Sequence, residues 1–329
     1  MKLPLSLTVR TESWPIAGSF TISRGAKTEA VVVVAELSDG RKRGYGECVP
    51  YARYNETVAS VTAQLQAMAG PLAQGLDRAA LQSAMPPGAA RNALDCAFWD
   101  IEAKRTGKPV HELAGLKAPK ALITAYTISI GEPRAMADAA KKNASRKLLK
   151  IKLGAPGDAA RIRAIREAAP QSELIVDANE GWTPDSLAEN LKACADAGVT
   201  LIEQPLPASN DAALASVARA IPVCADESVH DRASLGGLVG RYDAVNIKLD
   251  KTGGLTEALA MTDEALRLGF AVMTGCMVAT SLAMAPAMLV AQRARVIDLD
   301  GPLLLAKDRP DGLRYDGSLV YPPTAALWG

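Results

Sequence analysis

Histidine is scarce in this chain, because only His111 and His230 occur among its 329 residues. That scarcity disfavours metal sites built from imidazoles and catalytic triads that need a histidine base. The five cysteines lie far apart and form no Cys-x-x-Cys pair: Cys48, Cys96, Cys194, Cys224 and Cys276. Their odd number and wide spacing argue against a zinc knuckle and a disulfide framework, so we expect a reducing, cytoplasmic compartment.

Excess charge and long apolar runs are lacking as well. The formal net charge of +1 argues against a nucleic-acid partner. No apolar run approaches the roughly 20 residues that span a bilayer, and the N-terminus has no signal-peptide core, so we expect no membrane partner. What the chain does have is 49% hydrophobic residues, enough for a large core. Its length fits a barrel of about 250 residues with a smaller companion domain.

The first third of the chain reads as an α+β unit, which we assign as a capping domain over residues 1–118. Up to about residue 50 we expect antiparallel strands, because residues 30–37 are rich in valine and a Ser-Asp-Gly turn follows them. Residues 55–106 predict helices. The apolar residues within 89–103 have helical spacing, with Gly88 before them and Gly107 after them.

From about residue 120, short apolar strands alternate with alanine-rich helical segments. Eight strands are expected, at 122–128, 148–153, 173–178, 200–203, 222–226, 243–248, 271–275 and 296–298. Alternation of this kind predicts parallel βα units, and this number favours a (β/α)-barrel of seven to eight strands over an open sheet. We assign residues 119–302 to this modified TIM barrel. Residues 303–329 are expected to pack back on the capping domain.

Acidic side chains fall at the ends of three consecutive strands. Asp177, Glu203 and Asp226 are about one βα unit apart, and active sites of such barrels form at the C-terminal ends of the strands. Three carboxylates this close raise one another's pKa unless a cation joins them, and oxygen ligands suit Mg²⁺. The alternative is that each acid pairs separately with a surface lysine.

Lysines flank these acids on both sides. Lys150 and Lys152 are two residues apart on one strand, so they point the same way. Lys248 lies at the end of a strand on the other side of the acids. One lysine could remove a proton from one face of a substrate and the other could return it to the opposite face. We expect crowding beside a metal to lower their pKa. The alternative is that they are buried ion-pair partners.

These motifs together resemble the enolase superfamily, in its muconate-lactonising subgroup, over nearly the whole chain. The motifs are Lys150-x-Lys152, Asp177-Ala-Asn179, Glu203-Gln-Pro205, Asp226-Glu-Ser228 and Lys248. The resemblance implies that Asp177, Glu203 and Asp226 bind one Mg²⁺ per subunit. It also implies that Lys152 and Lys248 are the acid/base pair, Lys152 acting on the (R)-configured substrate and Lys248 on the (S)-configured one.

Two further features narrow the substrate. Asp298-x-Asp300 resembles the motif with which dipeptide epimerases of this subgroup hold a free amine, although an aspartate pair can also cap a loop. By the same resemblance, Arg24 falls in the capping-domain loop that closes over the barrel, where it would pair bidentately with a side-chain carboxylate unless it is only solvated. The same resemblance implies Thr127, Lys150 and Cys276 as substrate contacts.

The resemblance therefore implies an isomerase that interconverts L-Ala-L-Glu and L-Ala-D-Glu at the glutamate α-carbon through a Mg²⁺-stabilised enediolate. A role in murein peptide metabolism would follow, with a small dipeptide as partner and a homo-oligomer possible. Muconate cycloisomerisation, o-succinylbenzoate synthesis and N-acyl amino-acid racemisation use the same bases, but their substrates carry no free amine for Asp298 and Asp300. A catalytically inactive metal-binding scaffold is the remaining alternative.

Overall fold

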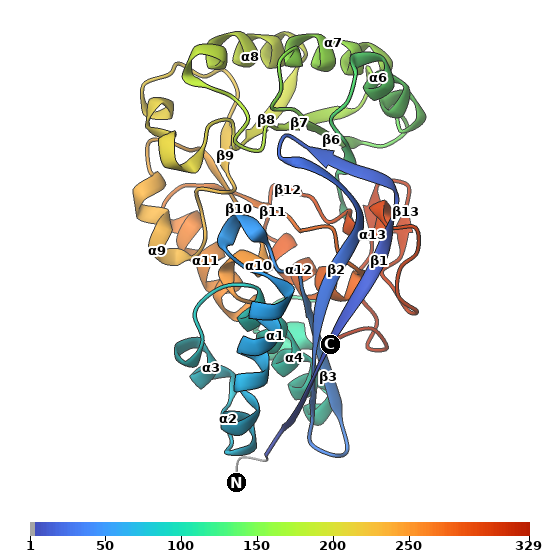
Figure 1. Cartoon of the computed structure of the whole chain (residues 1–329), viewed down its shortest axis with the longest axis vertical. Helices are drawn as coiled ribbons and strands as arrows, with labels where there is room; N and C mark the ends of the chain where they lie inside the picture. Colours follow the sequence, from blue (N-terminus) through green and yellow to red (C-terminus); the bar gives the residue numbers. More distant parts are fainter. Residues whose placement is uncertain (1–3) are drawn as a thin grey trace.

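The computed structural model describes residues 4–329, which form an N-terminal sheet with its helices, a parallel barrel and a small C-terminal sheet (Figure 1). The N-terminal sheet is antiparallel, in the order β1 (Ser6–Ile22), β2 (Gly25–Ser38) and β3 (Arg43–Cys48). Its helical elements are η1 (Ala52–Tyr54), α1 (Val58–Ala67), α2 (Ala69–Ala73), α3 (Arg78–Ala84), α4 (Ala89–Thr106) and α5 (Val110–Leu113). This arrangement agrees with the expected α+β unit.

Helix α4 packs directly on the backbone of β3. A Cβ atom at Gly46 would lie 2.0 Å from the carbonyl oxygen of Ala93, and one at Gly44 would lie 2.4 Å from that of Ala97. Only glycine permits this approach. The helix ends where the sequence predicts, at Gly107, whose φ of 69° terminates it.

Eight parallel strands form the barrel, in the unbroken order β5 to β12. They are β5 (Tyr126–Ile128), β6 (Leu148–Lys152), β7 (Glu173–Asp177), β8 (Val199–Glu203), β9 (Val223–Ala225), β10 (Ala244–Ile247), β11 (Ala271–Thr274) and β12 (Val296–Ile297). The end strands meet, because the backbone N–H of Ala125 donates to the carbonyl of Ile297 at 2.8 Å. The eight-stranded barrel prediction is confirmed.

Helices of unequal length connect these strands. The longer ones are α6 (Pro133–Lys142), α7 (Asp158–Ala168), α8 (Pro184–Asp196), α11 (Leu255–Arg267) and α12 (Ser281–Ala291). The single-turn elements are η2 (Ala208–Asn210), η3 (Ala212–Ala215), α9 (Arg232–Leu235), η4 (Gly236–Leu238), α10 (Leu249–Thr252) and α13 (Gly301–Leu304). None of the helices formed by residues 4–329 has both the length and the apolar character that crossing a membrane requires.

The first expected barrel strand, 122–128, is divided in two. Only β5 joins the barrel, whereas β4 (Leu122–Ile123) pairs antiparallel with β14 (Leu319–Val320), which in turn pairs with β13 (Tyr315–Asp316). A continuous apolar run cannot show this division, because both halves have partners. The C-terminal segment also contacts the first domain, where Trp328 Nε1 donates to the carbonyl of Cys96 at 3.1 Å.

Helix α10 joins the barrel to the N-terminal domain through Asp250. One oxygen of this buried carboxylate accepts hydrogen bonds from the backbone N–H of Val49 at 3.0 Å and from Asn92 Nδ2 at 2.8 Å. Neither donor is a cation, so burial raises the pKa of Asp250 to about 7. The folded protein therefore retains a proton on Asp250 that the unfolded chain releases near pH 4.

This difference predicts a pH dependence of stability. The folded pKa is raised, so Asp250 destabilises the fold progressively as the pH rises from about 4 to about 7, by up to roughly 4 kcal/mol. In Asp250→Asn the amide oxygen still accepts both hydrogen bonds, and this loss should disappear. Urea unfolding at pH 5 and pH 8 should show the variant gaining stability over the wild type at the higher pH. Parallel pH profiles would contradict the prediction.

Candidate active site

Three carboxylates meet at the C-terminal ends of neighbouring barrel strands. Asp177 ends β7, Glu203 ends β8 and Asp226 follows β9 directly. One oxygen atom of each lies within 4.8 Å of those of the other two, and all three residues are buried. The structure thus brings together the three acids that the sequence placed at successive strand ends.

Side-chain alternation along the strands explains why these acids lie in one layer inside the barrel. The inside of the barrel has an apolar floor that includes Leu148, Ile175, Leu201, Cys224 and Ala244. Because residues two apart share a face of a strand, the next inward positions are Lys150, Asp177, Glu203, Asp226 and Asn246. An apolar layer therefore seals the barrel beneath a charged one.

The predicted lysines contact these acids. Lys150 Nζ lies 2.6 Å from Glu203 Oε2 and 3.1 Å from Asp177 Oδ2. Lys152 Nζ lies 2.6 Å from the same Asp177 oxygen. Lys248, at the end of β10, lies 2.7 Å from Asp226 Oδ2. Three strands separate β6 from β10, so Lys152 and Lys248 flank the acids from opposite sides.

The charge balance differs among the three acids. Burial acts to raise the pKa of Asp226, but Lys248 and Lys251 outweigh it and hold the pKa well below its usual range. The pKa of Asp177 is lowered in the same way, by Lys152 and Lys150. For Glu203, burial and then repulsion from Asp177 raise the pKa to about 7. Glu203 is therefore the acid that the protein's own lysines neutralise least.

For Lys248 and Lys150, the protein's own groups do not produce the expected lowering of the pKa. Burial does act to lower the pKa of Lys248, but Asp226 and Glu203 outweigh it and raise the pKa well above its usual range. Lys150 is raised likewise, first by Asp298. For either lysine to act as a base at neutral pH, additional positive charge beside these carboxylates would have to lower its pKa. A divalent cation bound by the carboxylates would supply that charge.

The three acids fit such a cation. They offer carboxylate oxygens, the ligands that Mg²⁺ prefers, at adjacent positions. Within the described part of the chain, the buried Oε2 of Glu203 accepts no hydrogen bond, although Lys150 lies beside it. Asp177, Glu203 and Asp226 could therefore hold a metal ion.

A second acidic group lies beyond Lys150. Asp298 Oδ2 accepts from Lys150 Nζ at 2.7 Å, and Asp300 Oδ2 accepts from the backbone N–H of Thr127 at 2.6 Å. Among residues 4–329, the buried Oδ1 of Asp298 finds no hydrogen-bond partner. Burial and then Asp298 raise the pKa of Asp300 to about 7. Burial also raises the pKa of Cys276 well above its usual range, so its thiol is neutral.

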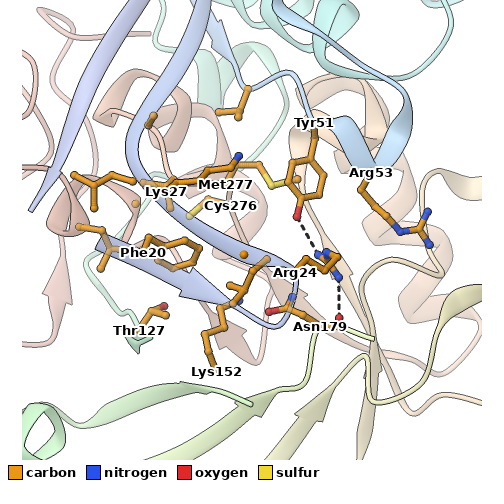
Figure 2. Close-up of a pocket in the computed structure, with 18 of the residues that line it drawn as sticks. Phe20, Arg24, Lys27, Tyr51, Arg53, Thr127, Lys152, Asn179, Cys276 and Met277 are labelled. Atoms are coloured by element: carbon orange, nitrogen blue, oxygen red, sulfur yellow. Dashed lines mark hydrogen bonds between the residues drawn. The ribbon is translucent and has the colours of Figure 1, made fainter. Parts of the chain in front are cut away.

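Arg24 lies at the end of the site opposite to Asp298 and Asp300, in the two-residue connection between β1 and β2. Its guanidinium donates to the carbonyl of Asn179 at 2.8 Å and to Tyr51 Oη at 2.9 Å (Figure 2). It also donates to Glu227 Oε1 at 2.7 Å. These bonds fasten the tip of the β1–β2 hairpin to the barrel rim, and Figure 1 shows the hairpin reaching there. Because both terminal nitrogens of Arg24 are engaged, a bidentate substrate contact would have to displace one of these acceptors.

A cavity of about 680 Å³ joins the two ends. The predicted site residues that line it are Arg24, Thr127, Lys150, Lys152, Asp226, Lys248, Cys276, Asp298 and Asp300. Asp177 and Glu203 are not among its lining residues. Phe20 of β1 covers Lys152, whose Nζ lies 5.7 Å from the ring centroid (Figure 2). A small molecule in this cavity would thus contact both Lys152 and Lys248.

Comparisons with known proteins agree with this architecture. Residues 5–115 match the family described as mandelate racemase / muconate lactonizing enzyme, N-terminal domain. Residues 134–326 match the family described as enolase C-terminal domain-like. The chain belongs to the mandelate racemase and muconate-lactonising enzyme family of the enolase superfamily.

Two curated members of this family align with most of the chain. L-Ala-D/L-Glu epimerase of Escherichia coli (strain K12) is 49% identical over 306 residues, which are 92% of this chain and 95% of that protein. N-acetyl-D-glutamate racemase of Pseudoalteromonas sp. is 46% identical over 300 residues, 91% of this chain and 95% of that protein. The prediction of an isomerase of the racemase and epimerase class is confirmed.

Solved structures of family members share the fold. An enolase family member from Agrobacterium tumefaciens with homology to dipeptide epimerases, with bound sodium and L-Ala-L-Glu, has a TM-score of 0.98 and 56% identity. The match covers 99% of this chain and 100% of that one. Dipeptide epimerase from Enterococcus faecalis V583, complexed with Mg and L-Leu-L-Tyr, has a TM-score of 0.91 and 29% identity, covering 100% and 99%.

The sequence alone did not identify several residues that contact the candidate site of this protein. Lys251 contacts Asp226, and Asn246 Nδ2 donates to Glu203 Oε1 at 2.7 Å. Glu227 pairs with Arg24. A signal existed for each, since Lys251 follows Lys248 by one helical turn, Asn246 precedes it by two strand positions, and Glu227 adjoins Asp226. The polar pair Lys150–Asp298 was also not foreseen, although both residues were named.

Proposed function

We propose that this protein is a dipeptide epimerase that interconverts L-Ala-L-Glu and L-Ala-D-Glu at the glutamate α-carbon. The observation that carries the proposal is the single cavity with a lysine on either side of a carboxylate cluster and an acidic pair at one end. A base on each face of an α-carbon is what inversion of configuration requires. Recycling of murein peptides is a process that would supply such a substrate.

The proposed reaction assigns each lysine one face of the substrate. Lys152 or Lys248, in its neutral form, takes the α-proton and leaves an enediolate, and the protonated partner returns a proton to the opposite face. Lys150 neutralises charge at the substrate carboxylate. A divalent cation held by Asp177, Glu203 and Asp226, for which we propose Mg²⁺, would supply the positive charge that makes the α-proton acidic.

Asp298 and Asp300 support a substrate with a free amine. Of these two carboxylates, Asp298 pairs with Lys150, and a substrate ammonium would supply positive charge beside Asp300. Asp298 Oδ1, which lacks a hydrogen-bond partner among the described residues, is the acceptor available for it. At the other end, Arg24 lies where a glutamate side chain would need a cation. The carboxylate of the substrate side chain would replace Glu227, Tyr51 or Asn179 as an acceptor for Arg24.

N-acylglutamate racemisation is the second candidate, favoured by the 46% identical N-acetyl-D-glutamate racemase. The two functions differ at the nitrogen, because an acylated amine carries no charge and would bring no cation to the buried Asp298–Asp300 pair, which has only Lys150 beside it. We favour the dipeptide because both carboxylates are buried and face the cavity.

A variant of Asp300 separates the two candidates. In Asp300→Asn the amide oxygen still accepts from Thr127 N–H, but the charge is lost. We expect kcat/KM for L-Ala-L-Glu to fall roughly 10- to 100-fold, the value of a charged hydrogen bond, with no matching loss for its N-acetylated form. Both substrates are assayed on wild type and variant by chiral chromatography. If wild type acts equally on both, or if Asp300→Asn impairs both equally, the amine assignment is wrong.

A further inference from the structure

Asp226 has a lysine on each of its two carboxylate oxygens. Lys248 Nζ donates to Oδ2 at 2.7 Å, and Lys251 Nζ donates to Oδ1 at 2.6 Å. Both lysines come from the short segment after β10, where Lys248 is the N-cap of α10 and Lys251 lies in its single turn. One helical turn therefore brings two ammonium groups to the same carboxylate.

The two lysines have different surroundings. Lys248 lines the cavity, whereas Lys251 is not among the cavity residues and its side chain is 1% exposed. Lys251 Nζ also donates to the carbonyl of Asp226 at 2.6 Å and to that of Asn246 at 2.9 Å. An ammonium has three N–H donors, so these three acceptors use all of them. Lys251 cannot reach a substrate, and moving its proton would leave buried acceptors unsatisfied.

Hydrogen bonds also join the α10 turn to the N-terminal domain. Asp250 accepts from Val49 and Asn92, and Arg91 donates to the carbonyls of Thr252 at 2.7 Å and Gly253 at 3.1 Å. The turn is thus held from outside by the capping domain. A rigid turn can fix Lys251 against Asp226 more accurately than a free loop could.

We propose that Lys251 is a positioning residue that holds Asp226 in one orientation for metal binding. By occupying Oδ1 and the backbone carbonyl of the same residue, it prevents rotation of the carboxylate and leaves Oδ2 directed at Lys248 and the neighbouring acids. This inference rests on the proposed metal role of Asp226. Its competitor is a purely electrostatic effect, in which the buried positive charge of Lys251 repels a cation and its removal tightens binding.

Metal affinity distinguishes the two. Mg²⁺ binding to the purified full-length protein is measured by isothermal titration calorimetry for wild type, Lys251→Met and Lys251→Gln. Lys251→Met should weaken binding about 10- to 100-fold, as loss of groups that orient metal ligands does. Lys251→Gln keeps a neutral donor and should recover much of that loss. Unchanged or tighter binding by Lys251→Met would overturn the proposal, as would Lys251→Gln binding no better than Lys251→Met.

Arg91→Met is the matched control. It also removes a buried cation bonded to the same turn, but one that contacts backbone carbonyls and no carboxylate of the cluster. It should lower the melting temperature and weaken Mg²⁺ binding much less than Lys251→Met does. Equal weakening by Arg91→Met would assign the effect to the turn and overturn the role of Lys251. If wild type bound no Mg²⁺, the metal assignment itself would fail, a result distinct from a failure confined to Lys251→Met.

Discussion

Replacing Lys248 by alanine is expected to lower the rate of dipeptide epimerisation roughly 10²- to 10⁴-fold, the contribution of a positioned acid or base. Lys248 lines the cavity and contacts Asp226 from the side opposite to Lys152. Each direction of the proposed reaction needs one lysine to remove a proton and the other to return one, so the loss should be similar from either epimer. Chiral chromatography of reactions started from each epimer measures it.

Two further variants are compared with Lys248→Ala. Lys152→Ala should show a comparable loss, because the proposed reaction gives the two lysines equivalent roles. Lys192→Ala is the control, since this exposed lysine on α8 pairs only with the surface residue Asp196 among the described residues and should retain wild-type rates. If Lys248→Ala kept more than about half of the activity in either direction, Lys248 would not be an essential base, because such a base contributes at least about 10²-fold.

Replacing Glu203 by glutamine is expected to weaken Mg²⁺ binding and lower the epimerisation rate on the order of 10³-fold. Glutamine keeps the oxygen that accepts from Asn246, so the change is mainly the loss of one negative charge. That charge is the one the lysines compensate least, since burial and Asp177 raise the pKa of Glu203 to about 7. Calorimetry and activity assays with added Mg²⁺ measure the two losses.

Glu47→Gln provides a control with a comparable environment. Glu47 is also buried and also pairs with a cation, Arg309 at 2.7 Å, but it lies between the first domain and the C-terminal segment. Its replacement should lower stability without changing Mg²⁺ affinity. If Glu203→Gln bound Mg²⁺ as tightly as wild type while losing activity, Glu203 would not be a ligand and the metal site would need reassignment.

The barrel and the acid cluster could be predicted because both depend on local regularities. Strand length, alternation and spacing placed Asp177, Glu203 and Asp226 at strand ends, and parallel strands bring such ends together. Division of residues 122–128 between two sheets could not be predicted, since Leu122 and Tyr126 have similar apolar neighbours. The partner of β4 is β14, almost 200 residues away, and no local pattern encodes it.

The details of the charges were beyond the sequence as well. The pKa of Lys248 depends on how many carboxylates lie within a few ångströms, which requires coordinates rather than residue order. The pairing of Lys150 with Asp298 likewise joins β6 to the segment after β12, at the closure of the barrel. The sequence predicts Arg24 in the loop over the barrel, but its pairing with Glu227 depends on how closely the hairpin meets the rim.

Solvent hydrogen exchange in the lysine variants tests the two-base account most directly. L-Ala-D-Glu and L-Ala-L-Glu are incubated separately in heavy water with Lys248→Ala or Lys152→Ala, and loss of the glutamate α-proton is followed by proton NMR. We predict that Lys248→Ala exchanges the α-proton of L-Ala-D-Glu but not of L-Ala-L-Glu, and that Lys152→Ala shows the reverse. Equal exchange of both epimers by either variant would contradict a lysine on each face of the substrate.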